Sequence, residues 1–470
     1  MQRTLTTWEL NRLKRYVLWI RRLEVREWDL PNEITRLVVP VSARTPPVLR
    51  LHLQELNWWP DKSNLSFLHE FLSPHLTKVN ITTKVFVHPA QVADPWDKEL
   101  PEEVVLKMRS VIKMLPPSPQ RLCIKLWGGL ETRLTEEISA FILRCGESLR
   151  EFSANLVLST QAIVHLMKLP NLRAWATKQG PPQVTNLIHH GVPEGITSLF
   201  PSLETLDIDG EAALEWLSLF EAANNGTLPW IMAGGSLSVL TYRHPTLPIG
   251  SPLITSILSF AGLTDLLLEM GCFMRPCVST FTDQDVERLA IALPRLEALT
   301  LGELPCGNDT CPTTVRSLLF LSVHCTKLRY LNIHFRMADL RADMLDLLSY
   351  AYSQGLQSKP KCPLEDLMVW EMRPELADDD PMLISIGMLM IFPSLVKFSA
   401  MSPAWIKVGS MVKAFGQIGE QITVMTENFM RVLNEEREQA GSGSPVRSAV
   451  SNTRLSFGLS RERDQTCTFY

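Results

Sequence analysis

The chain has 470 residues, of which 45% are hydrophobic and 20% charged, and its formal net charge is −4 at pH 7. The hydrophobic share is ample for a folded core. The charge balance argues against nucleic acid as the main ligand, because phosphate binding requires concentrated Lys and Arg. A chain of this length would ordinarily form several domains, unless it is built from repeats in which each unit contacts only its neighbours.

The N-terminal segment and the cysteine usage predict where the protein resides. Residues 1–10 include polar and charged side chains where a secretory signal peptide would have an apolar core. The most apolar run, residues 382–392, is too short to cross a bilayer. The nine cysteines, an odd number, fit reduced thiols better than a disulfide framework. We therefore expect an intracellular protein, cytoplasmic or nuclear, that is not inserted in a membrane.

One phrase recurs along the chain: an apolar or loop-ending residue followed by Leu-x-x-Leu-x-Leu, clearest at residues 201–208, 294–301 and 327–333. The mean step is about 31 residues, slightly longer and less even than the roughly 20 to 29 residues usual for a leucine-rich repeat. The repeats are therefore irregular. We place the first position of the successive ladders at Ile20, Val48, Leu76, Arg121, Leu149, Leu172, Leu203, Leu237, Leu263, Leu296, Leu328, Leu364 and Leu395.

Each ladder predicts a short strand followed by a helix. Because side chains alternate in a strand, the third and fifth residues after the first position point into the core, as Leu206 and Ile208 would, and the residues between them face outwards along a concave surface. Residues 283–293 have helical spacing of apolar side chains, with acids in the first turn. The sequence predicts an α/β solenoid of alternating helices and short parallel strands over residues 1–403. An ordinary α/β sandwich is the alternative, with longer and more variable intervals.

The C-terminal part differs from the repeats. Residues 404–437 place apolar side chains at mostly three- and four-residue steps with few helix breakers, which predicts a long amphipathic helix that caps the array. Residues 438–470 are rich in Ser, Gly, Asn, Thr and Arg with scattered apolar residues, so they cannot bury enough surface to fold. We expect a disordered tail there.

Five segments stand out by their order and irregular spacing: Tyr16–Val25, Leu51–Pro60, Phe71–Ile81, Leu169–Thr177 and Cys325–Ile333. Together they resemble the fungal (basidiomycete) F-box and leucine-rich-repeat proteins over roughly residues 8–437. In that family an N-terminal F-box binds a Skp-type adaptor of a cullin ubiquitin ligase, and the repeats hold the substrate. The resemblance therefore implies a substrate receptor of a ubiquitin ligase.

The sequence departs from that family at its N-terminus. An F-box would precede residues 8–22, where only seven residues stand. Residues 30–34, Leu-Pro-Asn-Glu-Ile, copy the usual F-box opening, but the prolines in residues 38–47 exclude the three helices that should follow. We expect these residues not to bind a Skp-type adaptor. The alternative function is a stand-alone leucine-rich-repeat interaction scaffold with no ligase role.

Catalytic signatures are missing from the sequence: no Gly-x-Ser-x-Gly, Walker loop, Gly-x-Gly-x-x-Gly or His-Glu-x-x-His occurs. We therefore expect neither an enzyme nor a cofactor. A weak zinc candidate is formed by Cys272 and Cys277 together with Cys306 and Cys311, two Cys-x4-Cys pairs that follow consecutive ladders and could meet on one edge. Two long loops that happen to contain Cys are the simpler interpretation, so we expect no metal.

The charges at the outward positions change along the array. They begin basic, as at Arg22 and Lys78, become acidic in the middle, and end in mixed polar and aromatic residues. The acids would steer a protein partner with a basic segment, and the exposed aromatic residues would be binding hot spots. A solvated acidic face without a partner is the alternative. The predicted partner-binding residues are Asp207, Asp209, Asp265, Glu269, Tyr330, His334, Asp366 and Trp370.

Overall fold

The structure of the protein is a computed structural model in which the chain divides into two compact units, Met1–Gly416 and Gln417–Tyr470. In the second unit the structure describes Arg431. In the first unit the structure describes residues 21–25, 52–59, 68, 71–82, 102–126, 130–177, 201–209, 237–244, 254–255, 257–258, 260–270, 281–302, 313–334, 340–353, 362–369, 380–400 and 403–416.

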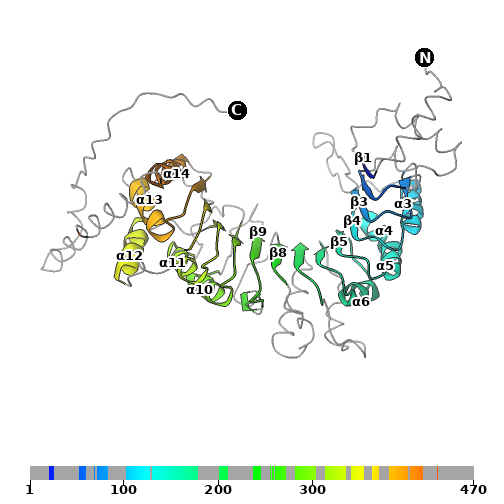
Figure 1. Ribbon diagram of the computed structural model, residues 1–470, viewed down its shortest axis with the longest axis horizontal. Helices are drawn as coiled ribbons and strands as arrows, with labels where there is room; N and C mark the ends of the chain where they lie inside the picture. The colour runs from blue at the N-terminus through cyan, green and yellow to red at the C-terminus, as the bar shows by residue number, and fades with distance from the viewer. Residues whose placement is uncertain are drawn as a thin grey trace, which may run out of the picture. The chain divides into compact units, whose positions relative to one another are not determined.

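The strands of the described residues form one open, entirely parallel sheet, and each strand pairs with its neighbours in chain order from β1 to β13 (Figure 1). A parallel pair needs a connection that returns over the sheet, and here every connection adds the next strand on the same side. The strands are β1 (Arg22–Val25), β2 (Glu55–Trp58), β3 (Lys78–Thr82), β4 (Arg121–Lys125), β5 (Glu151–Ala154), β6 (Ala174–Thr177), β7 (Thr205–Asp209), β8 (Val239–His244), β9 (Asp265–Met270), β10 (Ala298–Leu301), β11 (Tyr330–Ile333), β12 (Asp366–Val369) and β13 (Lys397–Ala400).

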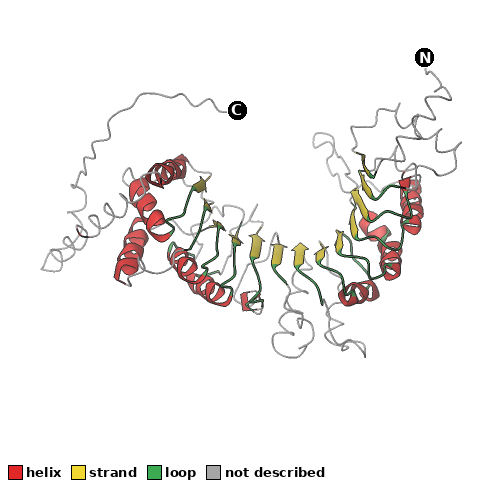
Figure 2. Ribbon diagram, viewed as in Figure 1, coloured by secondary structure: helices red, strands yellow, loops and turns green. Residues whose placement is uncertain are grey.

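The helices lie on one side of the sheet (Figure 2), and all those described in the first unit except α14, which follows β13, lie between successive strands along the chain. The predicted alternation of helices with short parallel strands is confirmed, and the sheet does not close on itself. None of the helices in the described part of the chain is long and apolar enough to cross a lipid bilayer. The helices are α3 (Glu102–Met114), α4 (Leu130–Arg133), α5 (Thr135–Arg144), α6 (Thr160–Lys168), α10 (Asp283–Ala292), α11 (Arg316–His324), α12 (Leu340–Ser353), α13 (Asp380–Ile391) and α14 (Pro403–Gly416).

Helix α10 shows how the sequence specifies these elements. The side chain of Thr282 accepts a hydrogen bond from the backbone N–H of Asp285, whose carboxylate accepts one from the N–H of Thr282, so the helix begins with a capping box. The carboxylate of Asp283 accepts hydrogen bonds from the backbone N–H of Thr314 at 2.7 Å and from the hydroxyl of Ser317 at 2.5 Å. One acidic turn therefore caps its own helix and also holds the start of the next.

The predicted ladder register is confirmed for most strands and wrong for two. The second ladder begins at Leu53, not at Val48, because Leu56 and Trp58 are the buried pair of β2. Because Trp58 takes the place of a Leu, the sequence fits a ladder that begins at Val48 as well as one that begins at Leu53. In the fourth ladder the buried pair of the strand is Leu122 and Ile124. A first position at Arg121 predicts Ile124 and Leu126 instead, two residues later.

The strand starts are joined by a repeated backbone contact. Before β9, the carbonyl of Thr264 accepts hydrogen bonds from two successive N–H groups, those of Glu297 at 2.7 Å and Ala298 at 3.0 Å. The same arrangement occurs at every step from β1 to β13. A tight turn precedes many of the strands, as in the bond from the Leu296 N–H to the carbonyl of Leu293. Because each unit repeats these bonds, the array keeps one register despite its uneven loops.

Helix α14 packs at the end of the array. The ring of Trp405 is stacked on that of Phe398 in β13 with 5.5 Å between the ring centroids, and Val408 and Val412 are fully buried. The predicted capping helix over residues 404–437 is described as far as Gly416, and the structure also describes Arg431. The rest of that helix and the predicted tail, residues 438–470, lie outside the described residues.

Candidate functional site

The candidate site is the sheet face opposite the helices, here called the open face (Figure 2). Because side chains alternate along a strand, the second and fourth residues of each strand face the helices, and the first and third form the open face. In β11, for example, Leu331 and Ile333 are fully buried among the core residues. The first residues, in strand order, are Arg22, Glu55, Lys78, Arg121, Glu151, Ala174, Thr205, Val239, Asp265, Ala298, Tyr330, Asp366 and Lys397.

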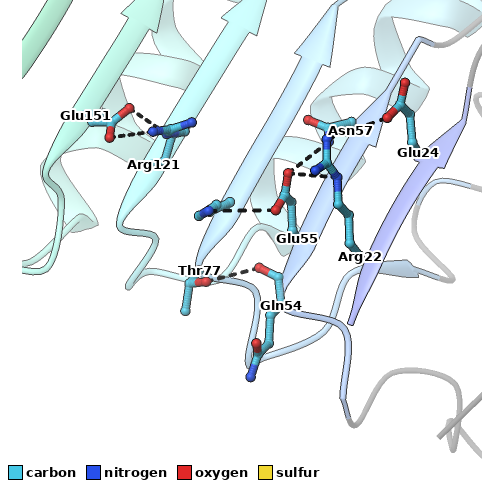
Figure 3. A network of polar contacts seen from close by, with 9 residues as sticks. Arg22, Glu24, Gln54, Glu55, Asn57, Thr77, Arg121 and Glu151 are labelled. Carbon is cyan, nitrogen blue, oxygen red and sulfur yellow. Dashed lines mark hydrogen bonds and ion pairs between the residues drawn. The ribbon is translucent and has the colours of Figure 1, made fainter. Parts of the chain in front are cut away.

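At the N-terminal end, the open face carries a row of paired charges (Figure 3). Glu55 lies 3.2 Å from the guanidinium of Arg22 and 3.7 Å from the ammonium of Lys78. Arg121 contacts Glu151 on the next strand at 2.5 Å. The predicted basic start of the face is therefore a row of alternating charge, because the true start of β2 places Glu55 between the two cations. Pairs this exposed contribute little to stability.

In the middle of the face, acids alternate with short or neutral side chains. Asp207 and Asp265 are half-buried in β7 and β9, and between them β8 contributes Thr241 and Val239. The predicted acids therefore lie on one stretch of the sheet, spaced by side chains that let a partner approach closely.

The register also aligns three charged residues at the ends of β7, β8 and β9. Asp209 is opposite Arg243, which is in turn opposite Glu269. The alternation of side chains predicts the two acids on the binding face but does not predict Arg243 between them. The strand register was the missing information, since Arg243 lies more than thirty residues beyond Asp209 in the chain.

The C-terminal end of the open face contains a partly buried polar cluster. Tyr330 of β11 is in register with Asp366 of β12, and the Oδ2 atom of Asp366 accepts a hydrogen bond from the Nζ atom of Lys397 at 2.6 Å. Asn332 is 4% exposed and Thr300, its register partner in β10, is 5% exposed. Sequence reasoning did not include Thr300 or Lys397 here, although both stand at outward positions of neighbouring ladders.

Two oxygen atoms in this cluster have no hydrogen-bond donor. The Oδ1 atom of Asn332 and the Oδ1 atom of Asp366 are buried and have no partner within the described structure. A buried acceptor left unpaired costs roughly 1–3 kcal/mol. A donor brought by a binding partner would recover part of that cost, provided that small side-chain movements open a path to the two oxygens.

Burial sets the protonation states in the cluster. It raises the pKa of Tyr330, and the neighbouring Asp366 carboxylate acts in the same direction, while Lys397, Asn332 and Thr300 oppose it. The phenol therefore stays protonated and can donate a hydrogen bond. Burial lowers the pKa of His334, which directly follows β11, so its imidazole is neutral near pH 7.

Of the other predicted site residues, Trp370 and the zinc candidates Cys272, Cys277, Cys306 and Cys311 lie outside the described residues. Within the described ranges, no group of three or more His, Cys, Asp or Glu side chains is placed to hold a metal ion. The cysteines that the structure does describe are free thiols: Cys123, Cys145, Cys325 and Cys362.

Comparison with known proteins gives no further assignment. The sequence matches no model of a known protein family and no curated protein. The fold and the chemistry of the open face are therefore the basis for the function proposed below.

Proposed function

We propose that this chain is a leucine-rich-repeat protein that binds a protein partner through the open face. The repeated Leu-x-x-Leu-x-Leu phrase, the open parallel sheet and the recurring backbone contact at each strand start support the repeat assignment. The polar cluster at β10 to β12, with its two unpaired buried acceptors, carries the binding proposal. An elongated sheet face without described helices over it is the surface that such arrays use for recognition.

The partner that best fits this face has a basic segment. A Lys or Arg side chain can donate to the oxygens of Asp366 and Asn332, and Tyr330 offers the aromatic contact typical of interface hot spots. Asp207 in β7 and Asp265 in β9 lie on the same face and would attract the basic segment over a longer range. The face thus combines long-range attraction in its middle with tight polar contacts at its C-terminal end.

The cellular role is proposed from the resemblance to fungal F-box and leucine-rich-repeat proteins. In this proposal the partner is a substrate recruited to a cullin ubiquitin ligase inside the cell. The prolines in residues 38–47 favour a second candidate, a stand-alone interaction scaffold with no ligase partner. The two candidates share the open face as the binding surface and differ in whether a Skp-type adaptor joins the complex.

Affinity capture with matched variants tests the binding proposal. Tyr330→Ala should weaken binding of the captured partner about tenfold or more, as hot-spot truncations do, with the fold retained. Ile291→Ala is the control, because Ile291 is an apolar side chain of α10 that is 55% exposed. Equal affinities of the two variants for the partner would reject the open face as the binding surface.

A further inference from the structure

A groove of about 650 Å³ lies at the edge of the sheet where β1 to β4 begin. Arg21, Gln54 and Thr77 each directly precede a strand, and Ser118 lies shortly before β4. Because the strands are parallel, these positions meet along one edge, which is distinct from the open face. Figure 3 shows Gln54 and Thr77 side by side at this edge. The lining residues used in the argument are Arg21, His52, Gln54, His75, Thr77 and Ser118.

The groove is lined by hydrogen-bond donors. A guanidinium, two imidazoles, an amide and two hydroxyls contribute N–H or O–H groups, and none of the described lining residues is acidic. The Nη1 atom of Arg21 donates to the carbonyl of His52 at 3.2 Å, which anchors the guanidinium at the groove. The hydroxyl of Thr77 donates to the carbonyl of Gln54 at 3.1 Å and fixes the wall between β2 and β3.

The acid that adjoins Gln54 in the chain is engaged elsewhere. Glu55 follows Gln54 in the chain, but its carboxylate contacts Arg22 and Lys78 on the open face (Figure 3). It therefore does not neutralise Arg21 by a direct contact. The positive charge of Arg21 in a donor-rich groove makes this edge complementary to an anion.

The size and the floor of the groove indicate what kind of anion it takes. The volume is within the roughly 300–1,000 Å³ usual for ligand sites and exceeds what a single inorganic ion would fill. Pro74, which is exposed, adds apolar surface to the lining. We propose that this groove binds an acidic segment of a protein, with an Asp or Glu carboxylate on Arg21 and a neighbouring apolar side chain against Pro74.

This site goes beyond the proposed function, because it lies on the strand-start edge and takes a ligand of the opposite charge. Its test needs no knowledge of the open-face partner. A short fluorescein-labelled peptide rich in Asp and Glu, with Leu between the acids, is titrated with the full chain, and its fluorescence anisotropy is measured at two ionic strengths. We expect saturable binding that weakens with salt.

Charge variants locate the bound peptide. Arg21→Glu and Ser118→Glu should each weaken binding at least about tenfold, since one removes a charge-assisted contact and both add repulsion. Arg21→Lys should retain most of the affinity. The matched control is Arg150→Glu. Arg150 is an exposed Arg that directly precedes β5, and its carbonyl accepts two successive N–H groups of the next unit, as the Arg21 carbonyl does. That variant should bind as the wild type does.

Two further measurements separate this groove from the open face and from a folding defect. Tyr330→Ala should leave peptide affinity unchanged, so a failure of the open-face proposal is distinguished from a failure of this one. Thermal melting of Ser118→Glu checks that the fold is intact. No peptide binding, equal losses in Arg21→Glu and Arg150→Glu, or binding of a phosphoserine peptide or inorganic phosphate without binding of the Asp and Glu peptide would each overturn the proposal.

Discussion

The side-chain amide of Asn155 forms two hydrogen bonds with the backbone of Leu126, which lies 29 positions earlier in the chain. Its Oδ1 atom accepts from the Leu126 N–H at 2.6 Å, and its Nδ2 atom donates to the Leu126 carbonyl. Both residues are buried at the ends of β4 and β5. The amide thus extends the pairing of the two strands by one step where the backbone ladder stops.

Replacing Asn155 should destabilise the array. Asn155→Ala leaves a buried N–H and a buried carbonyl without partners, so the free energy of unfolding should fall by about 2 kcal/mol or more. Asn171→Ala is the control, because the amide of Asn171 donates a single exposed bond to the Glu147 carbonyl. Denaturant titration followed by circular dichroism compares them, and equal losses would contradict the structural role of the buried pair.

The alternation of faces predicts opposite outcomes at adjacent positions. Leu299 is fully buried, whereas Ala298 is half-buried on the open face. Leu299→Asn should cost about 3 kcal/mol or more, because it buries an unpaired amide in the core. Ala298→Asn should cost less than about 1 kcal/mol. Thermal melts of the two variants check this, and similar melting temperatures would mean that the face assignment is wrong.

The buried thiols predict a stability change at alkaline pH. Burial raises the pKa of Cys145, Cys325 and Cys362 to about 12 from an ordinary value of 9.0. The unfolded chain therefore releases these protons at a lower pH than the folded one, and the free energy of unfolding should fall as pH rises from about 9 towards 12. Denaturant titrations of Cys325→Ala across this range should show a smaller fall than the wild type, and an identical fall would contradict the assignment.

The same burial predicts slow thiol chemistry in the native state. The thiolate is the reactive form, so iodoacetamide at about pH 8 should leave Cys325 and Cys362 unmodified until the chain is denatured. Mass spectrometry of peptides from native and denatured samples measures this. Rapid native labelling at both positions would show that these side chains are accessible.

Adaptor binding separates the two proposed cellular roles. Residues 1–470 should not retain a purified Skp-type adaptor on a column, because the prolines in residues 38–47 argue against the helices that should follow the F-box-like opening. An F-box fused before residue 1 serves as the positive control. Stable, stoichiometric retention by residues 1–470 alone would show that they bind the adaptor without a recognisable F-box.

Reversing the acids of the open face should slow association with a basic partner. Asp207→Lys combined with Asp265→Lys should lower the association rate constant and flatten its salt dependence, because these acids act by steering. The dissociation rate should change less than in Tyr330→Ala. Surface plasmon resonance at two ionic strengths distinguishes the two effects, and an unchanged salt dependence would remove the acids from the recognition surface.

Sequence periodicity predicts the alternation of helix and strand and most of the register, because a buried Leu pair recurs in nearly every unit. It fails at β2, where Trp58 replaces a Leu, and at β4, where the first position is not a Leu. The candidate site is less predictable. Whether Glu55 neutralises Arg22, or Arg243 lies between two acids, depends on which residues are opposite one another across strands. That register is set by three-dimensional pairing of segments tens of residues apart.

The strict chain order of the strands has a consequence for biosynthesis. Each strand pairs with the strands immediately before and after it in the chain, so pairing needs only short loop closures, and contact order stays low for a sheet of this width. A growing chain can add one strand to the sheet as soon as the next unit leaves the ribosome. The array can therefore assemble from its N-terminal end while its later units are still being made.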